Sequence, residues 1–259
     1  MLASFGPALA SGGLVGFSLG LVGGGGSILA TPLLLYVVGV SQPHIAIGTS
    51  AFAVSVNAFA NLIGHARSGN VRWRSAIVFA AVGSLGALTG STIGKLVDGQ
   101  RLLFLFGLLM IFVGAMMLRP RKVVGAVERP HDLNAILITG GVAFLTGCAS
   151  GFFGIGGGFL IVPGLILATG MPMINAIGSS LLAVGSFGLA TALNYAASGL
   201  VDWPLAFEFI AGGVIGGILG MMLANRLSSG RNTLNRIFAA LIFIVAAYVL
   251  YRSAGSLFG

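Results

Sequence analysis

Long apolar runs, separated only by short polar breaks, limit what this chain can fold into more than any other feature. Charged residues make up 7% of its 259 residues and hydrophobic residues 57%. A soluble domain carries about 25% charged residues, so this composition cannot supply a water-exposed surface. It excludes a soluble enzyme, a disordered chain and a disulfide scaffold, since Cys148 is the single cysteine. We therefore expect an all-α polytopic membrane protein.

The lengths of the runs predict how often the chain crosses a membrane. A hydrocarbon core of about 30 Å takes about 20 apolar residues per helix. We expect eight long transmembrane helices, at 2–22, 43–66, 72–97, 101–118, 133–153, 173–197, 203–227 and 233–253. Two shorter runs, 27–39 and 158–170, each follow a glycine cluster. The runs lack the two-residue alternation of barrel strands, which disfavours a β-barrel.

Three motifs occur twice in the same order, which indicates an internal duplication. They are the glycine-rich segment 20–26, AIGTS at 46–50 and SGNVRW at 68–73, which recur as 151–157, AIGSS at 176–180 and SGLVDW at 198–203. The spacing between copies is 131 residues for the first motif and 130 for the other two. We predict a first transmembrane repeat over 1–118, a basic linker over 119–132 and a second repeat over 133–259.

The basic residues predict that the two repeats are inverted relative to each other. Arg67, Arg72 and Arg74 occupy the break near residue 70, whereas the equivalent break in the second half has no Lys or Arg and carries Asp202. Lys and Arg are retained on the cytoplasmic side of a membrane. The flipped pattern therefore favours two inverted repeats joined by a cytoplasmic linker.

The two glycine clusters are the first candidates for a binding site. A helix interrupted within lipid leaves backbone groups unpaired, so it persists only where it lines a cavity or is buried in protein. The short run after each break would aim the N–H groups of a helix N-terminus inward, which favours an anion. The alternative is close helix packing, which the Gly83-Gly86-Gly90 and Gly213-Gly216-Gly220 stripes represent better. The candidate residues are Gly23, Gly24, Gly25, Gly26, Ser27, Gly154, Gly156, Gly157 and Gly158.

Small polar side chains early in two long runs are the second candidates. Thr49, Ser50, Ser179 and Ser180 supply neutral hydrogen-bond donors that could replace the water around an oxyanion, although helix-start hydroxyls also bond to their own backbone. Asn57 and Asn61 are four residues apart, on one face of a helix. For this pair, hydrogen bonding between helices is nearly as plausible as substrate contact.

Few ionisable groups lie within the apolar runs. His65 and Glu208 are candidates for proton coupling, and the alternative for each is a place at the membrane boundary. Lys95 and Arg226 fall near helix ends, where we expect them to extend toward the interface. We expect no enzymatic activity, no metal and no cofactor, because the sequence has neither paired catalytic carboxylates nor metal-binding or nucleotide-binding motifs. Nucleic acid is not an expected partner, because the basic residues are scattered among the breaks.

The duplicated order of a glycine-rich break with its following proline, AIGTS and SGxVxW resembles the TauE/SafE sulfite exporter family, over about Gly16–Leu250. The resemblance implies a multi-pass protein of the plasma membrane, the inner membrane in a bacterium, that carries sulfur-containing anions such as sulfite and organosulfonates. Carried over by position, the glycine breaks and the Thr49-Ser50 and Ser179-Ser180 pairs would face the substrate. Ile155 stands opposite Gly24, so the two breaks are not expected to be equivalent.

These observations together predict a secondary transporter, an exporter or a permease, that works by alternating access on a small sulfur-containing oxyanion. An anion channel is the first alternative, because it would use the same anion-attracting backbone. A membrane scaffold or receptor subunit without flux is the second. Proton coupling and assembly into a homo-oligomer stay open.

Overall fold

The described part of the chain is helical. The computed structural model describes residues 2–118, 133–154, 158–226, 240 and 242–253, and this part contains no strand. The long helices are α1 (Leu2–Val22), α3 (Pro43–Arg67), α4 (Trp73–Leu96), α5 (Gly99–Leu118), α6 (Leu133–Phe153), α8 (Met173–Ala196) and α9 (Trp203–Arg226). Their ends differ from the predicted runs by two residues at most, because each helix stops at a polar break. The predicted linker 119–132 lies outside the described residues, and the last predicted run is described as the helix Ile242–Ser253.

The first short run differs from the single helix that we predicted over 27–39. A 3-10 helix, η1 (Gly23–Leu29), begins at the glycines and is followed by one turn of α-helix, α2 (Ala30–Leu33), and a π-helix, η2 (Leu34–Val38). Four consecutive glycines favour an α-helix poorly, and the tighter 3-10 form is common next to helix ends. The second short run forms a regular helix, α7 (Gly158–Thr169), with Pro163 in its interior.

Five helices in the described part are long and apolar enough to cross a membrane. They are Pro43–Arg67, Trp73–Leu96, Ile136–Phe153, Met173–Ala196 and Trp203–Leu223. The apolar segments Phe5–Leu21, Gly23–Val38, Gly99–Ala115, Leu160–Thr169 and Ile242–Ser253 are shorter. A multi-pass helical membrane protein is therefore supported, whereas a total of eight long crossings stays a prediction.

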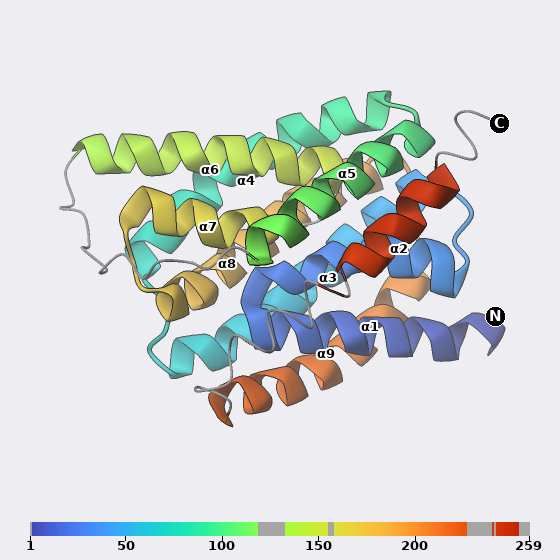
Figure 1. Cartoon of the computed structure of the whole chain (residues 1–259), viewed down its shortest axis with the longest axis horizontal. Coiled ribbons are helices and arrows are strands. Elements are labelled where there is room, and N and C mark those ends of the chain that lie inside the picture. Colours follow the sequence, from blue (N-terminus) through green and yellow to red (C-terminus); the bar gives the residue numbers. More distant parts are fainter. Residues whose placement is uncertain (1, 119–132, 155–157, 227–239, 241, 254–259) are drawn as a thin grey trace.

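The helices form two outer pairs around a central pair. Figure 1 shows α1 and α9 along one side, α4 and α6 along the opposite side, and α3 and α8 between them. The helix Ile242–Ser253 lies along α5, where Gly107 faces Leu250 and Gly114 faces Phe243. The start of α3 contacts the segment after α8, and the start of α8 contacts the segment after α3, so the central helices run in opposite directions.

Glycines bring the outer pairs into backbone contact. A side chain at Gly16 of α1 would overlap the backbone of Gly213 in α9, and one at Gly147 of α6 would overlap the backbone of Gly83 in α4. These two contacts are counterparts, because Gly147 follows Gly16 by 131 residues and Gly213 follows Gly83 by 130. Small residues are the usual means of close helix approach in lipid. The packing interpretation of the 83-86-90 and 213-216-220 stripes is confirmed.

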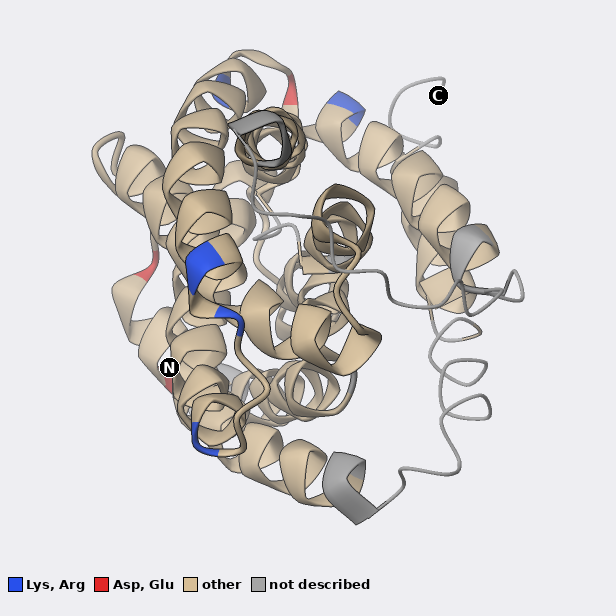
Figure 2. Ribbon diagram, turned by 90° about the vertical axis from the view of Figure 1, so that its left-hand side faces the viewer, with Lys and Arg blue, Asp and Glu red and all other residues tan. Residues whose placement is uncertain are grey.

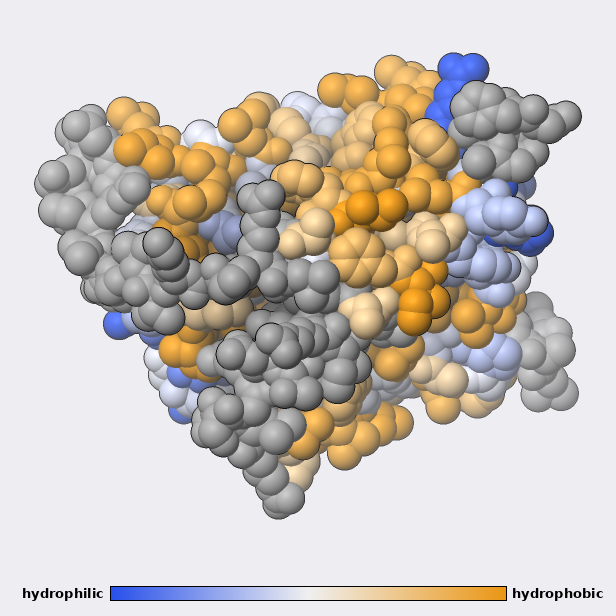
Figure 3. All heavy atoms as spheres, viewed as in Figure 1, coloured by the Kyte–Doolittle hydropathy of each residue, from blue (hydrophilic) through white to orange (hydrophobic). Residues whose placement is uncertain are grey.

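Apolar side chains cover the outside of the outer helices. Figure 3 shows hydrophobic residues over the middle of the visible face and hydrophilic ones toward its edges. Exposed large side chains include Leu85 and Ile93 of α4, Leu145 of α6 and Phe207 and Ile215 of α9. The few charged residues of the described part lie mostly in loops or near helix ends (Figure 2). Such a surface suits lipid and not water.

The backbone contacts predict which glycines the fold requires. Gly90→Ala would place a methyl group on the backbone of Cys148 in α6 and push α4 away. We expect a loss of about 1–3 kcal/mol of stability, measured as a lower apparent Tm in detergent. Gly141→Ala is the matched control, because nothing lies within 4 Å of its added methyl. A Gly90→Ala protein as stable as the control would contradict this account.

Candidate functional site

Both predicted glycine breaks end a long helix inside the protein. α1 ends at Val22 and the next residue, Gly23, has φ of 74°, while α6 ends at Phe153 and Gly154 has φ of 66°. Glycine adopts this left-handed conformation without a steric penalty. A side chain at Gly23 would strike Ile177 of α8, and one at Gly154 would strike Ile47 of α3. Each break is therefore pressed against the central helix of the opposite half.

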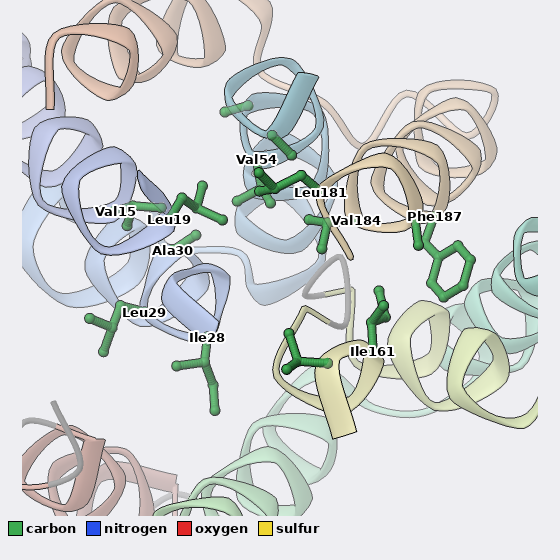
Figure 4. Packing of buried hydrophobic residues seen from close by; sticks show 14 of the residues in the cluster. Val15, Leu19, Ile28, Leu29, Ala30, Val54, Ile161, Leu181, Val184 and Phe187 are labelled. Carbon is green, nitrogen blue, oxygen red and sulfur yellow. The ribbon is translucent and has the colours of Figure 1, made fainter. Parts of the chain in front are cut away.

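The two segments that follow these breaks cross each other. A side chain at Gly24 would overlap the backbone of Gly158, and one at Gly158 would overlap the backbone of Gly24. Gly25, Gly26 and Ser27 are buried with Gly24 in η1. Figure 4 shows apolar residues of the surrounding cluster, among them Leu19, Ile161 and Leu181, which come from α1, α7 and α8. Gly156 and Gly157, which we predicted as site residues, lie outside the described residues.

Buried hydroxyl groups lie along the first of these segments. The Ser27 hydroxyl donates to the Gly24 carbonyl at 2.8 Å, and Thr31 shares a hydrogen bond of 2.9 Å with Ser50 of α3. Ser50 also donates to the Ile47 carbonyl, and Ser180 donates to the Ile177 carbonyl. The sequence analysis missed Thr31, whose only signal was its place before Pro32. Its counterpart is Val162, so the hydroxyl pair belongs to the first half alone.

Thr49 and Ser179 make reciprocal contacts between the halves. The Thr49 hydroxyl accepts from the backbone N–H of Asp202 at 2.9 Å, and the Ser179 hydroxyl accepts from the backbone N–H of Arg72, also at 2.9 Å. The preceding residue of each helix is glycine, and a side chain there would overlap the same loop of the opposite half. AIGTS and AIGSS are thus the receptors for the two copies of SGxVxW, which explains why these motifs occur together.

The structure separates the other predicted residues. Asn57 lies fully buried in the middle of α3, and Asn61 donates from Nδ2 to its carbonyl. His65 is buried near the end of α3, whereas Glu208 is half-buried in the second turn of α9. Neither of these two lies on the glycine segments, and their roles in proton coupling stay predictions.

Lys95 ties two helices together where we expected it to extend toward the interface. Its ammonium group donates to the carbonyl and the Oδ1 of Asn194 at 3.0 and 2.9 Å, and to the Ser198 hydroxyl at 2.8 Å. The negative end of the α8 dipole lies here and favours a cation. Asn194 in turn donates to Ser91 at 2.6 Å. A polar network therefore joins the ends of α4 and α8.

Known proteins match the chain along nearly its whole length. Residues 8–249 match the sulfite exporter TauE/SafE family. A "Probable membrane transporter protein" of Xylella fastidiosa, strain Temecula1, is 66% identical over 250 residues, which are 96% of this chain and 96% of that protein. The "Probable membrane transporter protein YunE" of Bacillus subtilis is 24% identical over 262 residues, covering 93% and 95%. No solved structure matches.

The helical architecture, the five apolar candidate spans and these relatives define the class of the protein, which is a multi-pass integral membrane transporter. Within that class, the chain belongs to the TauE/SafE sulfite exporter family.

The reciprocal contacts predict a measurable loss of stability. Thr49→Val keeps the shape of the side chain but leaves the Asp202 N–H without its acceptor. We expect a cost of about 1–2 kcal/mol, seen as a lower apparent Tm in detergent, and recovery in Thr49→Ser. Ser68→Ala is the control, because that exposed hydroxyl bonds only to the Gly64 carbonyl of its own helix. Equal Tm values for Thr49→Val and the control would contradict the contact's structural role.

Proposed function

We propose that this chain is a secondary transporter that moves a small sulfur-containing oxyanion, sulfite or an organosulfonate, by alternating access. The observation that carries this proposal is the crossing of the two glycine segments. Two interrupted helices meet there backbone to backbone, beside the buried hydroxyls of Ser27, Thr31 and Ser50. Backbone without side chains, inside a helix bundle, is where a membrane transporter can hold an ion.

The donors near this crossing suit an oxyanion that must also be released. Hydroxyl and backbone N–H groups are neutral, and no Lys or Arg is buried in the described part of the chain. A neutral site strips water from the anion without the Coulomb attraction of a full charge. The proposed site combines Gly24, Gly25, Gly26, Ser27, Ser50, Gly158 and Ser180, and adds Thr31 to the residues that the sequence suggested.

The reciprocal contacts of Thr49 and Ser179 suggest how access would alternate. They lie at opposite ends of the antiparallel pair of α3 and α8, and the 25 residues of α3 span about 37 Å. We assign one contact to each membrane face and treat the halves as inverted repeats. In this mechanism the loop 198–202 leaves Thr49 to open one face, and the loop 68–72 leaves Ser179 to open the other. His65 and Glu208 stay candidates for proton coupling.

Flux measurements test the function directly. Proteoliposomes are loaded with sulfite, methanesulfonate, thiosulfate or sulfate under a controlled pH gradient. We expect uptake of sulfite or methanesulfonate that is accelerated by the same unlabelled anion on the opposite side. Flux without such acceleration would indicate the alternative, an anion channel. Absence of flux for all four anions would sink the proposal, and flux that ignores the pH gradient would exclude proton coupling.

Disulfide staples test the alternating mechanism. In a Cys148→Ala background, Thr49→Cys is combined with Asp202→Cys, and separately Ser179→Cys with Arg72→Cys. The 2.9 Å contacts bring each pair of residues close enough for a disulfide. We expect either staple to stop flux at least about tenfold, because each holds one face closed, and a reductant to restore it.

The matched controls are the four single-cysteine proteins in the same background, which cannot form the staple. Each should transport alike with and without reductant. Undiminished flux in both stapled proteins would show that these ends need not separate, and alternating access through them would be wrong.

A further inference from the structure

The amide of Asn57 is buried in the middle of α3 without any hydrogen-bond partner. The residue is 0% exposed, and neither Oδ1 nor Nδ2 has a donor or an acceptor within the described part. The amide lies against Gly213 of α9, where a side chain would overlap Nδ2 and Oδ1. Burying an unpaired amide costs about 1–3 kcal/mol by protein mutational data, so this arrangement lowers the stability of the fold.

The equivalent position in the second half shows that packing does not require an amide. The counterpart of Asn57 is Phe187 of α8, and the counterpart of Gly213 is Gly83 of α4. Phe187 points toward α4 (Figure 4), and its ring stacks on that of Phe79 at 6.1 Å between centroids. One glycine therefore faces a stacked apolar ring and the other faces an unpaired amide.

We propose that Asn57 recognises the transported anion, and that it selects an oxyanion that still carries one proton. This inference rests on the proposed function and names the form of the substrate. An amide offers a donor and an acceptor, and both are unpaired here. A fully deprotonated anion would use only the donor and would face the carbonyl oxygen unfavourably. Hydrogen sulfite supplies both an acceptor and a donor, whereas methanesulfonate supplies acceptors alone.

The same geometry says when the amide becomes available. Gly213 covers it from α9, and the backbone of Gly213 is itself packed on Gly16 of α1. A ligand can reach Asn57 only when α9 moves off α3. α9 follows directly from the loop 198–202, whose Asp202 is held by Thr49. Release of that contact would free α9 and uncover the amide on the same face.

The test combines stability with transport. Asn57→Leu removes the unpaired polar atoms at nearly constant volume, so we expect an apparent Tm at or above that of the wild type. We expect its KM for hydrogen sulfite in proteoliposomes to rise at least about tenfold. The matched control, Phe187→Leu, should lower the Tm and leave KM unchanged. A purely structural amide would give the opposite result for Asn57, with a lower Tm and an unchanged KM.

A second substrate reads the specificity. The wild type should have a KM for methanesulfonate about tenfold above that for hydrogen sulfite, and this ratio should approach one in Asn57→Leu. Asn57→Ser, which keeps a donor and an acceptor, should preserve the ratio with both KM values raised, and it carries the test if the leucine variant does not fold.

The outcomes separate the two proposals. Wild-type flux of hydrogen sulfite together with unchanged KM values and an unchanged ratio in the Asn57 variants would overturn this inference alone. Absence of wild-type flux for both anions would overturn the proposed function and this inference with it.

Discussion

Close approach of backbones holds this protein together, because the helices gain little by hiding apolar side chains from a solvent that is itself apolar. The contacts between Gly16 and Gly213 and between Gly147 and Gly83 let the outer helices touch without intervening side chains. Everything between these pairs depends on that spacing. The central helices, the two glycine turns and the crossing at Gly24 and Gly158 occupy the room that the outer pairs leave.

The same feature serves two purposes that differ in their surroundings. In the outer pairs glycine contacts the regular backbone of a neighbouring helix, so every N–H and C=O group within the helix is already paired. At Gly23 and Gly154 glycine instead turns the chain and ends the helix. Only this second use frees backbone groups for a ligand, which is why the proposed site lies at the turns and not along the stripes.

The sequence predicted the helices well and the contacts between them poorly. Helix ends were predictable because each coincides with a polar break, such as the one around Arg72. The partner of Thr49 was not, because a hydroxyl early in a helix could equally bond to its own backbone, and its pairing with Asp202 exists only once the halves interlock. Thr31 was missed because one threonine inside an apolar run does not change its hydropathy. Lys95 was placed at a helix end, but its acceptors in α8 come from residues 99 and 103 positions further along the chain.

The pairing of α1 with α9 has a consequence for the order in which the chain can assemble. α1 is made first, yet the helix it packs against begins at Trp203, roughly 200 residues later. At about 5–20 residues per second during synthesis, α1 waits on the order of 10–40 s for its partner. During that time its row of glycines faces lipid or other proteins of the membrane. The cell's insertion machinery must therefore shelter an unfinished surface, whereas α4 meets α6 much sooner.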